Sequence, residues 1–297
     1  MNPSEPWGEM ECANGDVDTG EIVLRDGARL FYRLWRPDSQ DRVVLIHGLG
    51  GHGGWYTDFA NALAARGLGV LIADLRGHGQ SEGARGHVRR GSVLLKDTAE
   101  IVDFARSGVK RIHLLGHSMG AVLAVHASAQ IAPHTLILIN PWVKDTLKVS
   151  PLTVLSIASA GLMGSSRPWS SGGSPERMTD NPDARAILLR DALWGREQSC
   201  AFLTGVFWLR ILLFRTARHV VCPTIVIQTE QDRLVDHESS RRLYESLGCA
   251  ERAWSAPATG WHDFQFAADR AAFDDEVAAW CLTRSSPLRL AEPIAAR

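Results

Sequence analysis

The sequence predicts an α/β fold, in which helices flank a mostly parallel central sheet and a helical cap is inserted after the sixth strand. Short, continuous apolar runs alternate with segments of helical periodicity, as in parallel sheets that are covered on both faces. A Gly-x-Ser-x-Gly motif at residues 116–120 lies where one strand gives way directly to a helix. About 85 residues after Ile139 contain no clear strand, which marks the insertion.

Composition indicates a globular chain with little net charge to attract a partner. Of 297 residues, 45% are hydrophobic and 22% are charged, and the net charge is -1. This balance gives no argument for a nucleic acid partner or for attraction to an anionic membrane. The first residues lack the basic and apolar segments of a secretory signal. No apolar run approaches the roughly 20 residues that a membrane span requires.

The cysteines are odd in number and form no Cys-x-x-Cys pair: Cys12, Cys200, Cys222, Cys249 and Cys281. This pattern predicts reduced thiols in a cytoplasmic protein. The sequence contains neither the paired Cys/His spacing nor the His-Glu-x-x-His motif of zinc sites. We therefore expect no metal and no other cofactor.

The expected elements follow in chain order. Residues 1–20 and 284–297 show no periodicity and are predicted to be flexible tails. Asp26-Gly27, between residues 21–24 and 30–35, predicts a β-hairpin. After it, apolar runs predict strands and periodic segments predict helices: strands at 43–46, 70–73, 111–116, 136–139, 224–227 and 252–254, and helices at 56–66, 94–107, directly after 118, at 238–247 and at 264–282.

Residues 141–219 are predicted to form the helical cap, whereas residues 21–140 and 220–283 form the α/β core. The insertion holds two apolar helical runs, at 152–163 and 202–214. Open α/β sheets bind ligands at the carboxyl ends of their strands, where such a cap would lie. The run at 202–214 is apolar nearly all round. It is therefore either a buried cap helix or one wall of an acyl groove that touches lipid transiently.

Ser118 is the predicted nucleophile. A strand that turns straight into a helix strains the backbone of the residue between them and leaves no room for side chains at Gly116 and Gly120. The serine hydroxyl is then presented at the top of the sheet, where the N-terminus of the helix stabilises negative charge. The motif alone arises by chance in glycine-rich chains, but the strand before it and the helix after it favour this interpretation.

The loop after the first parallel strand has two interpretations. Residues 48–53 match Gly-x-Gly-x-x-Gly, and Asp74 ends the next strand 21 residues after Gly53, which is the pattern of an NAD-binding dehydrogenase. A hairpin precedes this strand, however, and His47 would crowd the pyrophosphate. The other interpretation is an oxyanion hole, formed by a backbone N–H near Leu49 together with the N–H of Met119.

A serine nucleophile on such a turn needs an acid and a base later in the chain, in the order Ser…Asp…His. Asp232 follows the strand at 224–227, and a buried carboxylate there would orient an imidazole and stabilise its charged form. Asp236 and Glu230 are the alternatives for the acid. His262 is the only histidine in the loop after the last strand and is the predicted base.

Several segments together carry a resemblance: His47-Gly48, the D-x-R-G-H-G-x-S-x-G block at 74–83, Gly-His-Ser-Met-Gly at 116–120, Asp-Arg-Leu-Val-Asp at 232–236, and His262. The chain resembles the α/β-hydrolase superfamily, and within it the monoacylglycerol lipase, lysophospholipase and serine-aminopeptidase-like branch. The resemblance spans residues 21–283 and implies the α/β-hydrolase fold.

By this resemblance Ser118 is the nucleophile, Asp232 the acid and His262 the base, and the oxyanion donors are Leu49 and Met119. Two positions depart from the family pattern. Thr229 stands where these enzymes usually carry glycine, and Asp263 where many carry glutamate.

The predicted function is a serine hydrolase that cleaves a carboxylic ester with an apolar acyl group from a small-molecule substrate. The same groups would serve a thioesterase, an acyl-transferring cyclase, a peptidase or a carbon–carbon bond hydrolase, and a ligand receptor on this fold is the non-enzymatic alternative. The candidate substrate-binding residues near the mouth are His47, Trp55, Trp142, Trp208 and Trp261.

A peptidase would also need a carboxylate to meet a free amino terminus. The cap offers Glu176, Asp180, Asp183, Asp191 and Glu197. These alternate with arginines, as on a solvated helix face, which favours the ester.

Overall fold

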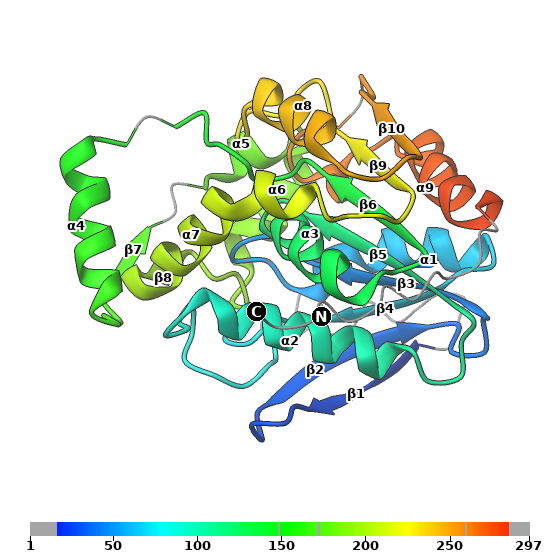
Figure 1. The fold of residues 1–297 in the computed structure, drawn as a ribbon, viewed down its shortest axis with the longest axis horizontal. Helices are drawn as coiled ribbons and strands as arrows, with labels where there is room; N and C mark the ends of the chain where they lie inside the picture. Colours follow the sequence, from blue (N-terminus) through cyan, green and yellow to red (C-terminus); the bar gives the residue numbers. More distant parts are fainter. Residues whose placement is uncertain (1–16, 148, 171–172, 259, 285–297) are drawn as a thin grey trace.

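The central sheet of the computed structural model has the strand order β1-β2-β4-β3-β5-β6-β9-β10 (Figure 1). The structure describes residues 17–147, 149–170, 173–258 and 260–284. β1 pairs antiparallel with β2 and β2 with β4, whereas all later pairs are parallel. The strands are β1 (Val17–Val23), β2 (Arg29–Trp35), β3 (Asp41–Ile46), β4 (Gly69–Ala73), β5 (Arg111–His117), β6 (Thr135–Ile139), β9 (Thr224–Ile227) and β10 (Arg252–Ser255). The predicted α/β class with a mostly parallel sheet is confirmed.

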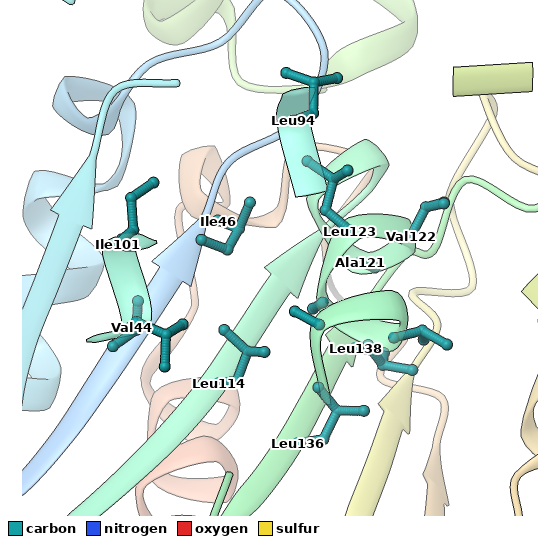
Figure 2. Close-up of a cluster of buried hydrophobic side chains, with 14 of the residues drawn as sticks. Val44, Ile46, Leu94, Ile101, Leu114, Ala121, Val122, Leu123, Leu136 and Leu138 are labelled. Atoms are coloured by element: carbon teal, nitrogen blue, oxygen red, sulfur yellow. The ribbon is translucent and has the colours of Figure 1, made fainter. Parts of the chain in front are cut away.

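Helices cover both faces of this sheet: α1 (Thr57–Ala65), which follows the short turn η1 (Gly53–Tyr56), and α9 (Ala271–Thr283) on one face, and α2 (Gly91–Ala105), α3 (Met119–Ile131) and α8 (His237–Ser246) on the other. Successive side chains of β3 alternate between the two layers. Val43 and Leu45 pack with α1 and α9, whereas Val44 and Ile46 pack with α2 and α3 (Figure 2). All four are fully buried. Burial on both faces explains why the inner strands are continuous apolar runs.

Residues 141–219, which we call the cap, connect β6 to β9. The elements within it are α4 (Pro151–Leu162), β7 (Pro168–Ser170), α5 (Pro175–Met178), α6 (Pro182–Arg190), β8 (Glu197–Ser199) and α7 (Cys200–Ala217). The strands β7 and β8 were not expected. They pair antiparallel over three residues each, which is too short to leave a periodic signal.

Two element boundaries differ from the expectation. β1 begins at Val17, inside the predicted tail 1–20, because residues 17–20 pair with 32–35 of β2. The final helix is divided into the 3-10 turn η2 (Phe264–Phe266) and α9, since Ala267 between them is extended at ψ 135. The rest of the two predicted tails, residues 1–16 and 285–297, lies outside the described residues.

The long helix α7 is apolar on both its buried and its exposed side. Among the described helices it is the one with the length and hydropathy to cross a membrane, with a mean hydropathy of 1.5 over 18 residues. Within the fold, 44% of it is buried, and Phe202 and Val206 pack into the core. Phe207 and Ile211, on the other side, are 42% and 49% exposed. α4 stands further from the sheet (Figure 1), and of its residues only Gly161 is buried.

Backbone hydrogen bonds join the cap to several loops of the core. Among these bonds, the N–H of Gly195 donates to the carbonyl of Gly50 at 2.8 Å, that of Ser199 to Gly86 at 2.8 Å, and that of Thr146 to Leu234 at 3.0 Å. Gly50 and Gly86 have φ of +72 and +60, and a Cβ at either would overlap a carbonyl oxygen of the cap. Glycine at these two positions therefore permits the close approach of the two backbones.

Candidate active site

Ser118 lies at the turn between β5 and α3. Its backbone has φ 55 and ψ −116, which is rare for a residue with a side chain and costs conformational energy. A Cβ at Gly116 would overlap the backbone of Ala121, and one at Gly120 would overlap the carbonyl of Ile46. Both flanking glycines are therefore required by the turn, and the serine side chain is directed into a cavity.

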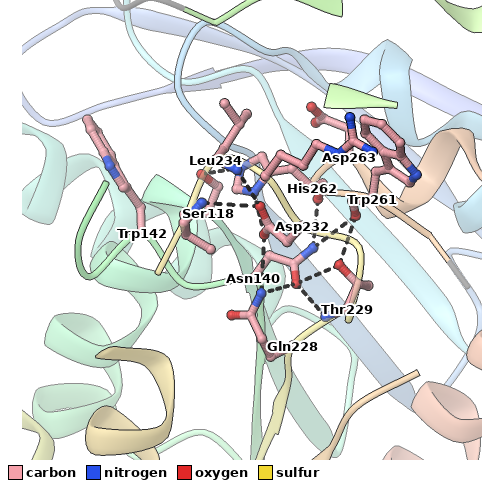
Figure 3. A network of polar contacts seen from close by, with 12 residues as sticks. Ser118, Asn140, Trp142, Gln228, Thr229, Asp232, Leu234, Trp261, His262 and Asp263 are labelled. Atoms are coloured by element: carbon pink, nitrogen blue, oxygen red, sulfur yellow. Dashed lines mark hydrogen bonds and ion pairs between the residues drawn. The ribbon is translucent and has the colours of Figure 1, made fainter. Parts of the chain in front are cut away.

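His262 and Asp232 form a hydrogen-bonded line with Ser118 (Figure 3). The Oγ of Ser118 lies 2.9 Å from Nε2 of His262, and Nδ1 of His262 lies 2.8 Å from Oδ2 of Asp232. Because an ionised carboxylate only accepts hydrogen bonds, the Nδ1–H donates to Asp232 and Nε2 is left to accept the serine proton. The second carboxylate oxygen accepts from the N–H groups of Leu234 and Val235, at 2.8 and 3.1 Å.

The two alternative acids lie elsewhere in the structure. Asp236 caps α8, because its carboxylate accepts from the N–H of Ser239 at 2.8 Å, and Glu230 is exposed. Asp232 is thus the carboxylate that the structure brings to His262.

The charges of this pair reinforce each other. Burial by itself would raise the pKa of Asp232 and lower the pKa of His262. The attraction and hydrogen bond between the two outweigh burial, so the pKa of Asp232 is lowered and that of His262 is raised. The carboxylate is therefore held ionised, and the imidazole beside the serine hydroxyl gains affinity for a proton.

The loop after β3 packs directly on the nucleophile. A Cβ at Gly48 would lie 3.2 Å from the Cβ of Ser118, and Gly48 and Leu49 line the same cavity as Ser118. Met119 is the first residue of α3, so its N–H has no acceptor within the helix. Leu49 and Met119 thus flank Ser118 from two different elements.

His47 lies behind this loop rather than in the cavity wall. It is fully buried. Its Nε2 accepts from the N–H of Leu75 at 2.9 Å, and its Nδ1–H donates to the carbonyl of Gly48 at 2.8 Å. Burial lowers the pKa of His47 to about 3, so the ring is neutral. The structure therefore gives it a role in holding the loop and not in touching substrate.

The dehydrogenase interpretation fails at Asp74. Both oxygens of this fully buried carboxylate are engaged within the protein. Oδ1 accepts from the N–H of Gly53 at 2.6 Å and from Arg33 at 3.3 Å, and Oδ2 accepts from the N–H of Gln80 at 2.8 Å. A ribose hydroxyl cannot reach it. The spacing between Gly53 and Asp74 instead reflects the hydrogen bond by which Asp74 holds the loop.

Comparison with known proteins identifies the family. The family described as serine aminopeptidase, S33, matches residues 37–269, well over half of the chain. The chain belongs to this branch of the α/β-hydrolases. Monoglyceride lipase of Homo sapiens is 30% identical over 245 residues, which cover 77% of this chain and 78% of the lipase. An uncharacterized abhydrolase domain-containing protein of Dictyostelium discoideum is 27% identical over 234 residues, which cover 76% of this chain and 24% of that protein.

The crystal structure of Paleococcus ferrophilus monoacylglycerol lipase shares the fold, with a TM-score of 0.78 at 24% identity over 86% of this chain and 99% of that one. The resemblance drawn from the sequence motifs is confirmed at the level of family and fold. This S33 hydrolase also contains several buried contacts around Ser118 that the motifs did not indicate.

Asn140 joins the ends of β6 and β9 to the loop that carries His262 (Figure 3). Its Nδ2 donates to the carbonyl of His262 at 2.8 Å and to that of Trp261 at 3.2 Å, while its Oδ1 accepts from the N–H of Thr229 at 2.8 Å. The residue is fully buried at φ 44. The sequence motifs did not point to Asn140, although a single polar residue directly after an apolar strand is a usable signal.

His117, next to the nucleophile, links the loop of the base to the loop after β3. Its Nε2–H donates to the carbonyl of His262 at 2.9 Å, and its Nδ1 accepts from the hydroxyl of Tyr56 at 2.7 Å. The hydroxyl oxygen of Tyr56 in turn accepts from the N–H of Gly48 at 3.4 Å. Burial lowers the pKa of His117 to about 3. A neutral imidazole therefore connects two loops that meet at Ser118.

Asp191 of the cap anchors the same loop of this S33 hydrolase from the other side. Its Oδ2 accepts from Nε2–H of His52 at 2.9 Å and from Nε1–H of Trp55 at 2.6 Å, and its Oδ1 accepts from the N–H of Leu193 at 2.8 Å. Burial acts to raise the pKa of Asp191, but the hydrogen bonds outweigh it and the pKa is lowered. The prediction that Asp191 lies on a solvated helix face is wrong, because only 1% of the residue is exposed.

The cavity at Ser118 has apolar and aromatic walls beside the polar residues of the site. Trp55 and Trp142 line it, together with Tyr56, Trp194, Leu49, Leu147, Met178, Leu234 and Val235. The structure does not bring Trp208 or Trp261 to it. Trp208 is 50% exposed on the outer face of α7, and the ring of Trp261 lies under Arg233, 3.8 Å from the guanidinium carbon.

Among the described residues, no group of three His, Cys, Asp or Glu side chains could hold a metal ion. The described cysteines, Cys200, Cys222, Cys249 and Cys281, are buried and unpaired. Cys12 lies outside the described residues.

Proposed function

We propose that this chain is a serine esterase that cleaves carboxylic esters with an apolar acyl group, as a monoacylglycerol-lipase-like enzyme. The observation that carries the proposal is the line from Ser118 through His262 to Asp232, at 2.9 and 2.8 Å, on the wall of a cavity that apolar and aromatic side chains line in part. Similarity to a protein named monoglyceride lipase supports the substrate class.

The geometry supports a two-step acyl transfer to water. The Oγ of Ser118 attacks the ester carbonyl carbon while Nε2 of His262 takes its proton, and Asp232 holds the imidazolium through Nδ1–H. The N–H groups of Leu49 and Met119 donate to the developing oxyanion. His262 then protonates the departing alcohol, and water, activated by the same nitrogen, releases the acid from Ser118.

The proposal includes transient contact between the cap and a lipid surface, and a cytoplasmic location. Leu152 and Leu155 of α4 are 79% and 66% exposed, and Phe207 and Ile211 of α7 are 42% and 49% exposed. Exposed apolar faces of this kind are typical of surfaces that meet a partner or a membrane. An acyl substrate held in a micelle or membrane would approach Ser118 from this side.

Aminopeptidase activity is the second candidate, because two carboxylates, Asp145 and Asp263, line the cavity. Asp145 pairs with Arg210 at 2.9 Å. Asp263 accepts from Nε2 of Gln265 at 3.0 Å, and burial raises its pKa to about 6. It is therefore ionised at neutral pH and would meet an ammonium group. The five cap carboxylates that the sequence suggested for this purpose are all described, and none of them lines the cavity.

A serine-directed fluorophosphonate tests the nucleophile. It should label Ser118, and Ser118→Ala should abolish labelling and lower kcat by about 10⁴-fold or more. Ser92→Ala, an exposed serine on α2, is the matched control and should react like the wild type. Labelling at another residue would contradict the proposal.

A substrate panel separates the two candidates. p-Nitrophenyl esters, acyl-thioesters and aminoacyl-amides are compared by kcat/KM, and the esters should be the best substrates. Faster turnover of aminoacyl-amides, lost in Asp263→Asn, would establish the aminopeptidase instead.

A further inference from the structure

Two cavities adjoin each other at Trp142. The catalytic cavity is small, about 80 Å³, whereas a second cavity of about 460 Å³ lies between α4, α7 and the loop that follows β6. Trp142, Asp145 and Leu147 line both of them. A group that extends from an acyl carbonyl at Ser118 into the second cavity therefore passes between these three residues, of which Trp142 is the largest.

Two side chains fix this indole, and a backbone bond fixes the chain that carries it. The backbone N–H of Trp142 donates to the carbonyl of Ser118 at 3.1 Å, and the Nε1–H of its indole donates to Oδ1 of Asp145 at 2.6 Å. Arg210 of α7 donates to Oδ2 of Asp145 at 2.9 Å and to the carbonyl of Val143 at 3.0 Å. Its guanidinium carbon lies 4.5 Å from the centre of the indole ring. A cation–π contact and a charged hydrogen bond thus hold one ring between two cavities.

The walls of the second cavity suit an alkyl chain. The apolar residues that line it come mainly from α4 and α7: Leu147, Val149, Val154, Ile157, Ala158, Trp169, Leu203 and Phe207. The charged members, Lys144, Asp145 and Arg210, include the pair that already engages Trp142. Ser170 and Thr204 are the other polar members, but most of the lining is apolar, so methylene groups would leave water on entering this cavity.

We propose that Trp142 is a specificity-determining residue. Asp145 and Arg210 lock its indole as a wall that ends the catalytic cavity, so that longer acyl chains are accepted only when the ring gives way and their distal methylenes enter the second cavity. This inference rests on the proposed esterase function and adds to it the residue that limits chain length. Each methylene that leaves water multiplies binding about fourfold, so the wall sets the chain length at which kcat/KM stops rising.

Chain-length profiles test the wall. With p-nitrophenyl esters from butyrate to dodecanoate, wild-type kcat/KM should rise and then level. In Trp142→Ala the rise should continue, so that the dodecanoate-to-octanoate ratio of kcat/KM increases by about tenfold or more. Arg210→Met, which keeps the stem but removes both contacts to Asp145 and the ring, should shift the profile in the same direction by less. Trp208→Ala, an exposed tryptophan on the same helix, should keep the wild-type profile.

Two results would overturn the inference: an unchanged profile in Trp142→Ala, or an equal loss at every chain length, which would show a packing role alone. Binding provides a test that does not depend on turnover. In Ser118→Ala, the affinity for saturated fatty acids should level at a medium chain, and adding Trp142→Ala should extend the improvement to longer acids. If the wild type turned over no ester, the proposed function would fail, while the fatty-acid series would still decide whether Trp142 is a wall.

Discussion

Replacing Asp191 by alanine removes the carboxylate through which the cap holds the loop that carries Leu49. This carboxylate accepts hydrogen bonds from His52, Trp55 and the N–H of Leu193, between 2.6 and 2.9 Å. Hydrogen bonds to a charged group each contribute about 1.5–3 kcal/mol, and buried donors left without a partner add a penalty. Because the three bonds share one group they do not add fully, so we expect a loss of about 3–5 kcal/mol of unfolding free energy.

Asparagine at the same position should destabilise the protein less than alanine does. Its amide oxygen can still accept from His52 and Trp55, but its NH₂ group then faces the N–H of Leu193, and both of these groups are donors. Asp191→Asn should therefore lower the unfolding free energy by about 1–3 kcal/mol. In Asp191→Ala the loop bearing Leu49 loses its anchor, which displaces an oxyanion donor, and kcat should fall by about 10- to 100-fold. Asp191→Asn keeps the bonds from His52 and Trp55 to that loop and should lower kcat by less. KM should change less than kcat.

Urea unfolding and steady-state kinetics on the two variants are the assay, with Asp180→Ala, an exposed carboxylate of the cap, as the control. Because the folded pKa of Asp191 is lowered from its usual 3.8, the stability it contributes is present above that value and is lost as pH falls through the folded pKa. The difference in unfolding free energy between wild type and Asp191→Ala should therefore become smaller below about pH 4. A cost under about 1 kcal/mol with unchanged kcat would refute the reasoning.

Three further predictions concern the site itself. Asp232→Asn should leave folding intact and lower kcat by about 10²- to 10⁴-fold; an equal loss in Asp236→Asn would contradict the assignment. Asn140→Ala should lower both the melting temperature and kcat, since the carbonyl of His262 loses a buried donor; unchanged kcat would show that His262 is positioned without it. Burial raises the pKa of Asp263 in the folded protein to about 6. Its contribution to the free energy of unfolding is therefore fully present below the pKa of about 4 that an aspartate has in the unfolded chain, and it is lost as the pH rises through 6. Wild-type stability relative to Asp263→Asn should thus drop by about 3 kcal/mol between pH 4 and 7.5, and parallel pH curves would exclude this.

The sequence predicted those parts of the structure that have a local signal. The inner strands are continuous apolar runs because both of their faces are covered, and the Gly-x-Ser-x-Gly turn has a steric requirement that the glycines reveal. Ser118, Asp232 and His262 each follow a recognisable strand, so their meeting at the carboxyl ends of the sheet could be expected from topology.

Contacts between distant segments left no such signal. Asp191 looked like one of several solvated carboxylates, because its partner His52 lies 139 residues away. The mistake about Trp208 has a different cause. A helix that is apolar nearly all round does not indicate which side faces inward. In α7 the buried side holds Val206 and Leu209, which turns Trp208 outward.

The backbone bonds between the cap and the core loops bear on whether the two parts can unfold or be exchanged separately. The cap is bonded to the core at Gly50, Gly86 and Leu234, among other places, and loses these bonds once the core unfolds, so core and cap should melt in a single cooperative transition. Exchange of residues 141–219 with those of a relative would place a foreign backbone against Gly50 and Gly86, where the clearance admits no side chain. A working chimera therefore has to transfer the receiving loops with the cap, and the unit of exchange is larger than the insertion itself.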